Sequence, residues 1–203
     1  MDKTIKYIIG IDEVGRGPIA GPVAVCAFQL LIADYQLLVK NAKEELKIPL
    51  RDSKKLSKKQ REIWFNFLKK RKEEGNCDYM VSFVSPLNID KFGIAKCIQK
   101  ALNKSLIDLK LKPEEVSIFL DGGLHAPVEY LYQETIIKGD ELHPIISMAS
   151  IMAKVSRDRV MTNYAKEYRD YGFENHSGYG TKAHYDAIKK LGQTSIHRKT
   201  FIH

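Results

Sequence analysis

The stretch IKYIIGIDEVGRGPIAGPVAVCAFQLL, residues 5–31, decides the fold of this 203-residue chain. Its first part is rich in isoleucine and ends at the acidic pair Asp12–Glu13, a pattern that predicts a β-strand. The Gly- and Pro-rich segment 14–22 predicts a turn, and the apolar run 23–31 predicts a second strand. Two strands joined in this way form a β-hairpin, so we expect two carboxylates at its turn end.

Helical and extended patterns alternate along the rest of the chain. Ser57 and Gly75, for example, bound a run whose apolar residues recur at helical spacing, as an N-cap and a stop signal do. The expected helices cover residues 58–74, 87–109, 147–168 and 181–191, and the expected strands cover residues 77–85, 116–123 and 132–140. This order predicts an α/β fold in which helices cover a mixed sheet.

The composition excludes several classes of protein. No run of about 18 apolar residues occurs, so no membrane span is expected. The N-terminal segment also lacks the pattern of a signal peptide. We therefore expect a cytoplasmic protein. Because there is no internal repeat and no linker, residues 1–203 are expected to form a single domain.

The charge and the cysteine content narrow the possible classes of protein further. Lys and Arg number 33 against 25 for Asp and Glu, which gives a formal charge of +8. This balance is compatible with a polyanionic partner such as a nucleic acid, although a solvated basic surface is the alternative. Cys26, Cys77 and Cys97 form no CxxC pair, which predicts buried small side chains in a reducing compartment rather than a zinc site or disulfides.

Three of the predicted strands end on acidic residues, namely Asp12–Glu13, Asp121 and Asp140. Neighbouring strand ends meet at one edge of a sheet. Carboxylates gathered there repel one another unless hard cations neutralise them, which predicts an oxygen-ligand site for Mg²⁺ or Mn²⁺. For each acid alone, a turn beside glycine is the alternative. Adjacent residues also point to opposite faces of a strand unless the strand ends there.

Seven segments, spread over nearly the whole chain, form a further pattern. They are GIDEVGRGPIAGPVAV (10–25), RDSKKLS (51–57), FLDGG (119–123), KGD (138–140), SMASIMAKVSRDR (147–159), HSGYGTKAH (176–184) and IHRKTF (196–201). Together and in this order, they resemble the ribonuclease HII family. A lone KGD carries no information, whereas the first segment combined with DSKKLS is highly specific.

The resemblance implies a ribonuclease H-like mixed β-sheet flanked by α-helices, with a short C-terminal helical segment. It implies that Asp12, Glu13, Asp121 and Asp140 are catalytic and bind two ions, Mn²⁺ or Mg²⁺. By analogy, Asp12 bridges the ions and Asp140 completes the site of the attacking water, whereas Glu13 and Asp121 hold the other ion. Two ions about 4 Å apart activate a water and stabilise the leaving 3′-oxygen, so the products carry a 3′-hydroxyl and a 5′-phosphate.

The loop formed by Gly15, Arg16 and Gly17 also matches the family. There it recognises the 2′-hydroxyl at the cut site, the group that distinguishes ribose from deoxyribose. Glycines let backbone amides approach a sugar or phosphate closely, and arginine offers a fork of donors. The alternative is a hairpin turn that needs flexible residues.

Three further residues are implied to bind substrate. Tyr179 matches a family tyrosine that stacks on the sugar beside the ribonucleotide, with a packing role as the alternative. Lys54 and Lys55 resemble a phosphate-contacting pair, with solvated surface lysines as the alternative. Gly180 stands where proline commonly follows the tyrosine, so we expect a more mobile loop.

Other basic side chains stay outside the expected site. Lys154, Arg157 and Arg159 either contact phosphate or pair with nearby acids. The histidines show no metal-binding spacing and are expected at the surface or in packing. They are His125, His143, His176, His184, His197 and His203.

The expected activity is hydrolysis of RNA in RNA–DNA hybrids and of ribonucleotide-containing duplex DNA, cut 5′ to the ribonucleotide, by a monomer. Three alternatives stay open. A ribonuclease HIII usually carries a different loop and an extra N-terminal domain, whereas here the acids begin at Asp12. A junction-resolving or transposase-type nuclease cuts DNA without ribose. A silent RNA/DNA-binding module has no use for four mutually repulsive acids.

Overall fold

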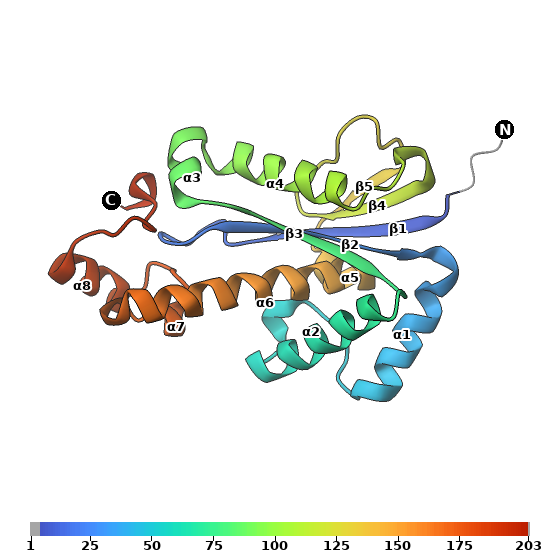
Figure 1. Cartoon of the computed structure of the whole chain (residues 1–203), viewed down its shortest axis with the longest axis horizontal. Helices are drawn as coiled ribbons and strands as arrows, with labels where there is room; N and C mark the ends of the chain where they lie inside the picture. The colour runs from blue at the N-terminus through green and yellow to red at the C-terminus, as the bar shows by residue number, and fades with distance from the viewer. Residues whose placement is uncertain (1–4, 203) are drawn as a thin grey trace.

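The computed structural model describes residues 5–202, which form a five-stranded mixed sheet with helices on both faces (Figure 1). The strands are β1 (Tyr7–Val14), β2 (Val23–Leu31), β3 (Asp78–Val84), β4 (Val116–Asp121) and β5 (Gln133–Ile136). Their order across the sheet is β3-β2-β1-β4-β5. The expected α/β architecture, a mixed sheet covered by helices, is confirmed.

Strand β1 lies at the centre of the sheet because both of its edges are paired. Along its whole length it runs antiparallel to β2, as the hairpin pattern predicts. On its other edge it runs parallel to β4, with Ile11 opposite Leu120. The next residue on each strand is acidic, Asp12 on β1 and Asp121 on β4. Two carboxylates distant in sequence are therefore neighbours at the same end of the sheet.

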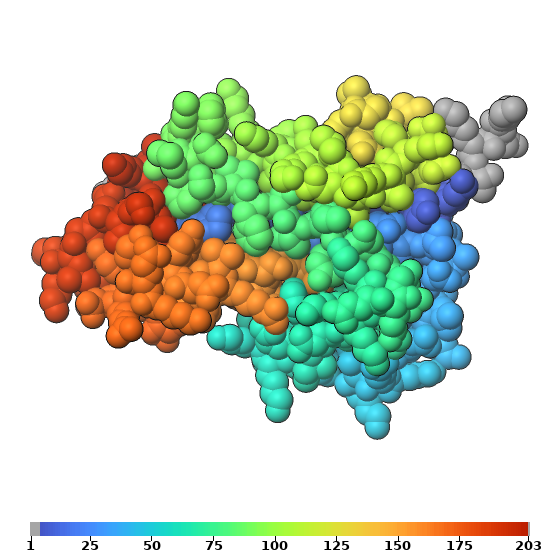
Figure 2. All heavy atoms as spheres, viewed as in Figure 1, coloured from blue at the N-terminus to red at the C-terminus, as the bar shows by residue number. Residues whose placement is uncertain are grey.

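The helices form two layers. In the described residues they are α1 (Ile32–Leu46), α2 (Lys58–Glu73), α3 (Pro86–Phe92), α4 (Ile94–Asp108), α5 (Gly139–Leu142), α6 (Pro144–Glu167), α7 (Phe173–His176) and α8 (Lys182–Leu191). Helices α1, α2 and α6 cover one face, and α3 and α4 cover the other (Figures 1 and 2). Because side chains alternate along a strand, Ile8 of β1 belongs to the first core and Ile9 to the second.

Helix α6 packs tightly against β1. Residues 145–153 of α6 are all buried, and the small side chains of Ser147 and Ala149 let the helix come close to its neighbours. A Cβ atom on Gly10 of β1 would lie 2.2 Å from the carbonyl oxygen of Ile145. Only glycine fits there, so Gly10 sets the distance between the strand and the helix.

The sequence patterns miss helix α1. Its buried side follows helical spacing, with Leu38 and Ala42 packed in the core. The helix begins directly after β2, and the preceding Leu31 makes no side-chain cap. Because no start signal separates the strand from the helix, this element is hard to recognise from the sequence.

The expected helix at 87–109 is two helices in the structure. Gly93 takes a φ of 81° between α3 and α4, a conformation that glycine adopts without strain and that an α-helix cannot contain. The expected helix at 147–168 begins earlier, at Pro144, because proline is favourable in the first helical turn.

The expectation that Asp140 ends a strand is wrong. Strand β5 already ends at Ile136, and Lys138, with a φ of 58°, turns the chain into the short helix α5. Asp140 lies in the first turn of this helix. The carboxylate therefore approaches the sheet end from a helix and not along the sheet.

Cys26, Cys77 and Cys97 are buried and unpaired, in agreement with their expected role as small apolar side chains. Within residues 5–202, no helix is both long enough and apolar enough to cross a bilayer.

Gly10→Ala tests the contact between β1 and α6. We expect the free energy of unfolding to fall by about 3 kcal/mol, because the new methyl group would overlap the backbone of α6, which cannot move aside as a side chain can. Urea denaturation followed by circular dichroism measures the change. Gly123→Ala is the control, since a Cβ there has no neighbour within 4 Å. Wild-type stability of Gly10→Ala would contradict the close packing.

Candidate active site

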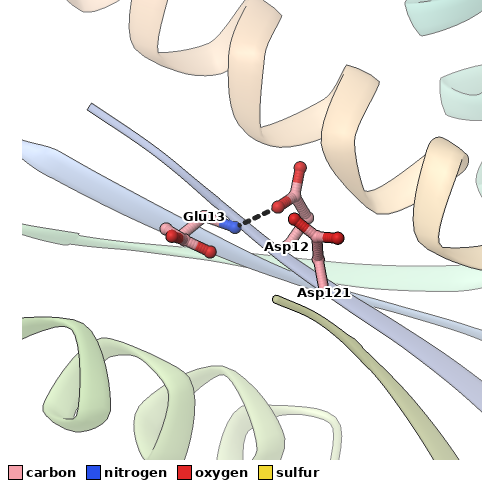
Figure 3. Close-up of side chains that lie close together, drawn as sticks. All are labelled: Asp12, Glu13 and Asp121. Carbon is pink, nitrogen blue, oxygen red and sulfur yellow. Dashed lines mark hydrogen bonds between the residues drawn. The ribbon is translucent and has the colours of Figure 1, made fainter. Parts of the chain in front are cut away.

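Asp12 and Asp121 lie on neighbouring strands, near the carboxyl ends of β1 and β4. Together with Glu13 they offer carboxylate oxygens that all lie within 4.8 Å of one another (Figure 3). The strand continues to Val14 and so does not end at the acidic pair as expected. The Asp12 carboxylate accepts a hydrogen bond from the backbone N–H of Glu13 at 2.8 Å. This bond fixes the orientation of the buried carboxylate.

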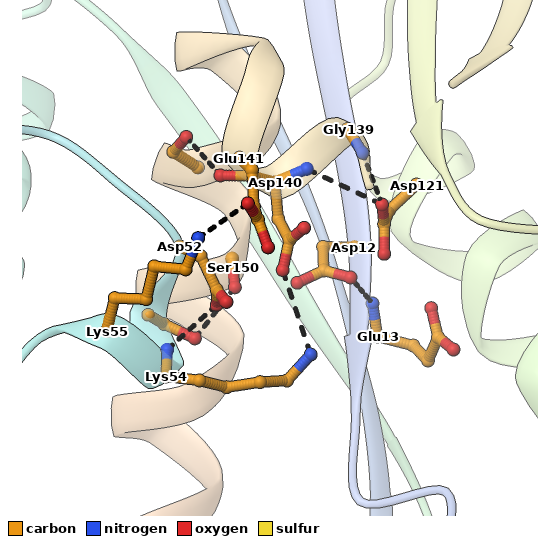
Figure 4. Close-up of polar contacts among 12 residues, drawn as sticks. Asp12, Glu13, Asp52, Lys54, Lys55, Asp121, Gly139, Asp140, Glu141 and Ser150 are labelled. Atoms are coloured by element: carbon orange, nitrogen blue, oxygen red, sulfur yellow. Dashed lines mark hydrogen bonds and ion pairs between the residues drawn. The ribbon is translucent and has the colours of Figure 1, made fainter. Parts of the chain in front are cut away.

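Asp140 reaches the same region from helix α5. Its backbone N–H and that of Gly139 donate to one carboxylate oxygen of Asp121, at 3.4 and 2.7 Å. Its own carboxylate lies 3.7 Å from the Lys54 ammonium, and Figure 4 shows it between Lys54 and Asp12. The structure thus brings three of the four expected acids into one cluster and the fourth beside it.

Burial and mutual repulsion disfavour the charged form of these carboxyl groups. Asp12 is 6% exposed, and burial followed by the negative charge of Glu13 raises its pKa well above the ordinary value. Burial also raises the pKa of Glu13. For Asp140, burial and then the charges of Asp121 and Asp52 raise the pKa to about 6. Positive charge among these groups would relieve the repulsion.

The chemistry of the donors indicates which positive charge fits. The cluster consists of carboxylate oxygens, and within residues 5–202 no histidine or cysteine belongs to it. Carboxylates are the ligands preferred by hard divalent cations such as Mg²⁺ and Mn²⁺. A pair of such ions can activate a water and stabilise a leaving oxygen. The arrangement therefore fits metal-dependent hydrolysis of a phosphodiester.

Asp52 is an acidic neighbour that the sequence patterns do not single out. It is 5% exposed, accepts a hydrogen bond from the backbone N–H of Lys54 at 2.8 Å, and acts electrostatically on Asp140. In sequence it is indistinguishable from an ordinary residue that caps a helical turn. It holds Lys54 beside the acids, whereas Lys55 forms an ion pair with Glu141.

The loop between β1 and β2 presents Arg16 and Gly17 to the outside. The Arg16 side chain is 59% exposed, and its guanidinium lies 3.2 Å from the Glu13 carboxylate. A Cβ on Gly17 would have no neighbour within 4 Å. Gly15, in contrast, has a φ of 90°, and a Cβ there would overlap the Arg157 side chain. Backbone geometry requires glycine at Gly15, whereas Gly17 leaves open space beside the acids.

Two fully buried arginines, Arg157 and Arg198, hold this loop from the interior of the protein. The sequence patterns predict neither role. Arg198 donates three hydrogen bonds to loop carbonyls, and Arg157 donates two to the loop and one to Ser177. The loop acceptors are Gly15, Arg16 and Gly21 for Arg198, and Ala20 and Pro22 for Arg157. Arginines are mostly exposed, so the sequence offers only one hint, a long loop whose carbonyls need donors. Within residues 5–202, Arg157 therefore binds carbonyl oxygens and forms no ion pair with an acid.

Lys154 and Arg159 of helix α6 pair with acids. Lys154 lies 2.8 Å from Asp158, and Arg159 lies 2.6 Å from Glu62. Of the two roles considered for them, ion pairing is the one that the structure contains.

Tyr179 lies on the rim of a cleft of about 430 Å³. Other lining residues include Lys58 and Arg61 of α2, and Lys154 and Asp158 of α6. In Figure 2 the outline is indented between the orange and the teal segments, which carry these residues. Tyr179 is 44% exposed, so its ring is available to a ligand in the cleft.

The histidines agree with the expected surface and packing roles wherever the structure describes them. His125 is exposed, His143 stacks on Phe119 with ring centres 4.3 Å apart, and His184 and His197 are buried. His203 lies outside the described residues.

Comparison with known proteins gives consistent matches over this chain. A family model described as Ribonuclease HII matches residues 9–203, a range that includes all four acids. Ribonuclease HII of Clostridioides difficile (strain 630) is 40% identical over 201 residues, which cover 99% of this chain and 72% of that protein. Ribonuclease HII of Endomicrobium trichonymphae is 43% identical over 200 residues, which cover 98% of this chain and 87% of that protein.

Solved structures show the same architecture. RNase HII in the PCNA:RNase HII complex from Archaeoglobus fulgidus has a TM-score of 0.75 at 25% identity, covering 97% of this chain and 96% of that one. Ribonuclease H2 from Pyrococcus horikoshii OT3 has a TM-score of 0.66 at 27% identity, covering 96% and 93%. Bst-RNase HIII in complex with Mn²⁺ has a TM-score of 0.66 at 16% identity, covering 98% and 68%. The expected ribonuclease H-like fold is confirmed.

The metal-free protein is expected to lose stability as the pH rises from about 4 to about 6. Asp140 has a pKa of about 6 in the folded protein, against about 3.9 in an unfolded chain. The folded state thus keeps a proton that the unfolded state releases. The resulting stabilisation is complete below about pH 4 and is lost as the pH rises through about 6. Urea denaturation across this range, with EDTA present, measures the effect.

Asp140→Asn is the matched control, because an amide does not titrate. Its stability should fall less over the same range. Groups with a lowered pKa, such as Asp90, act alike in both proteins, so the difference between the two curves reports Asp140 together with its interaction with the neighbouring carboxylates. Parallel curves would show that Asp140 does not titrate between these pH values.

Proposed function

The chain belongs to the ribonuclease HII family, and from this premise we propose that it cuts duplex DNA on the 5′ side of embedded ribonucleotides and hydrolyses RNA in RNA–DNA hybrids. It is an endoribonuclease of the ribonuclease H type. The observation that carries the proposal is the carboxylate cluster of Asp12, Glu13 and Asp121, with Asp140 beside it.

We assign Asp12, Glu13, Asp121 and Asp140 as catalytic ligands of two divalent ions, Mn²⁺ or Mg²⁺. The donor set supports this assignment, since its oxygens converge within 4.8 Å for three of the acids. The raised pKa values of Asp12 and Asp140 support it too, because they reflect burial first and then repulsion between the carboxylates, and bound cations offset both effects. Bst-RNase HIII, which shares the fold, is a Mn²⁺ complex. When bound, such ions activate the attacking water and stabilise the leaving 3′-oxygen, giving 3′-hydroxyl and 5′-phosphate products.

The chain itself orients these ligands. Gly139 and Asp140 donate their backbone N–H groups to Asp121, which couples the end of β4 to helix α5. The Lys54 ammonium, 3.7 Å from Asp140, supplies positive charge at the edge of the acids. We propose that it contacts a substrate phosphate there. Lys55 is proposed to do the same, with the phosphate replacing Glu141 as its partner.

The loop of Gly15, Arg16 and Gly17 is proposed to recognise the ribose 2′-hydroxyl. In a trans peptide the C=O and the following N–H point in opposite directions. Because Arg198 holds the carbonyls of Gly15 and Arg16, the N–H groups of Arg16 and Gly17 face away from the buried guanidinium. Neither N–H has a partner within residues 5–202. Two free donors beside the carboxylates suit a hydroxyl or a phosphate oxygen.

Tyr179 is proposed to stack on the sugar next to the ribonucleotide, which its exposed position on the cleft rim supports. We also propose that the active form is a monomer. Curated relatives named Ribonuclease HII at about 40% identity favour this activity over that of ribonuclease HIII.

A gel assay with labelled duplexes tests the substrate. Duplexes containing zero, one or four ribonucleotides are incubated with Mn²⁺ or Mg²⁺, with and without EDTA. We expect cutting on the 5′ side of the single ribonucleotide, cutting of the four-ribonucleotide duplex, and no cutting with EDTA. Cutting of the all-DNA duplex would instead favour a junction-resolving or transposase-type nuclease. Binding without cutting would favour a silent module.

Asp12→Asn and Asp140→Asn test the assigned ligands. Each variant is expected to lower the cleavage rate by more than about 1,000-fold, because each removes a charge that holds the ions at the reacting phosphate. Substrate affinity, measured by fluorescence anisotropy, should stay within about threefold, since phosphate contacts come from other residues. Asp34→Asn on α1 is the matched control. Near-normal turnover of either variant would refute its assignment.

A further inference from the structure

Three histidines pack together behind the Tyr179 loop. The His176 ring stacks on that of His184, with centres 4.4 Å apart. The Nε2 atoms of His184 and His197 lie 3.1 Å apart, and these two residues are 0% and 2% exposed. Buried polar atoms at this distance form a hydrogen bond, so one ring donates a proton and the other accepts it.

The direction of this bond follows from Thr194. Its backbone N–H, which can only donate, points to Nδ1 of His197 at 2.8 Å. Nδ1 is therefore an acceptor, and the hydrogen of the neutral ring is on Nε2. That Nε2–H donates to Nε2 of His184. His184 must then carry its hydrogen on Nδ1.

The other end of the chain of bonds requires the same arrangement. Nδ1 of His184 lies 2.9 Å from the backbone carbonyl oxygen of Tyr179, which can only accept. A directed relay thus runs from the N–H of Thr194 through His197 and His184 to the C=O of Tyr179. Both fixed ends demand the same pair of neutral tautomers. Burial, the largest cause, lowers the pKa of His184 to about 4 and also lowers that of His197.

The segment that anchors the relay also holds the loop between β1 and β2. Ile196 accepts a hydrogen bond from the backbone N–H of Gly21 at 2.8 Å. Arg198 holds the carbonyls of Gly15 and Arg16. His197 lies between Ile196 and Arg198 in the sequence, and its side chain connects to Tyr179 through His184. One short segment therefore connects both substrate-facing loops.

We propose that His184 and His197 are positioning residues that fix the backbone of Tyr179 relative to the Gly15–Gly17 loop and thereby set the affinity for a ribonucleotide-containing strand. The inference rests on the proposed function, in which one loop contacts the ribose 2′-hydroxyl and Tyr179 contacts the sugar beside the ribonucleotide. Both histidines are buried, and within residues 5–202 neither belongs to the acidic cluster. Their effect is expected in KM and not in the chemical step.

The tautomers test the relay without any substitution. Two-bond ¹H–¹⁵N correlation spectra of the full chain at neutral pH, labelled with ¹⁵N in histidine, report which ring nitrogen carries hydrogen. We expect His197 protonated on Nε2 and His184 protonated on Nδ1. The His184→Gln variant assigns the His184 signals. A His184 ring with its hydrogen on Nε2, or a charged ring, would overturn the relay whatever the enzyme's activity.

A matched pair of variants tests the positioning role. In His184→Asn an amide N–H can occupy the place of Nδ1 and still donate to Tyr179. In His184→Gln the amide reaches the place of Nε2 and leaves the Tyr179 carbonyl without this donor. For the single-ribonucleotide duplex we expect KM to rise about tenfold in His184→Gln and less than about threefold in His184→Asn, with kcat within about twofold. His125→Gln, at an exposed site, is the control for loss of a histidine.

A double variant separates this inference from the proposed function. If His184 acts through Tyr179, then His184→Gln should have no further effect on KM in a Tyr179→Ala background. An equal rise of KM for both His184 variants, or a rise that persists without Tyr179, would overturn the positioning role. Wild-type KM in Tyr179→Ala alone would refute the proposed substrate contact and with it the inference, whereas the tautomer measurement would still report on the relay.

Discussion

The candidate site depends on how closely β1 approaches helix α6. Gly10 has no side chain to hold the carbonyl of Ile145 away, so the start of α6 lies directly against the strand. This contact, together with the hydrogen bonds from Gly139 and Asp140 to Asp121, brings Asp140 beside Asp12. The acids do not attract one another. Apolar packing of helix α6 holds them together against their repulsion. The packing of the core thus offsets the free-energy cost of gathering the carboxylates.

Buried charges of both signs occur a short distance apart, and each sign is stabilised differently. The carboxylates of Asp12 and Asp121 accept backbone N–H groups yet still repel each other. In the part of the chain that the structure describes, Arg157 and Arg198 pair with no carboxylate and instead donate to carbonyl oxygens. Hydrogen bonds to charged groups contribute about 1.5–3 kcal/mol each. Three per guanidinium can offset a burial penalty of several kcal/mol, and in doing so they give an irregular loop a fixed shape.

The sequence predicts the fold class, the central hairpin and the cysteine environment, because apolar periodicity and turn residues are local signals. It predicts the acids as well, although the closeness of Asp12 and Asp121 follows from strand pairing that no local pattern contains. The sequence does not predict helix α1, because no cap separates it from β2. It does not predict the path of the chain to Asp140 either, because Lys138 adopts a conformation unusual for lysine. The roles of Asp52 and Arg198 depend on burial by distant segments, which composition and spacing cannot reveal.

Arg198 and its loop partner Gly15 are 183 residues apart in the sequence. During synthesis on the ribosome, β1 and its following loop emerge well before the donors that complete the loop. Contacts of such separation form late and slowly. A nascent chain interrupted before residue 198 therefore has its acidic residues but lacks the support of the loop beside them. The loop that we propose to recognise ribose therefore acquires its buried support only after Arg198 has been synthesised.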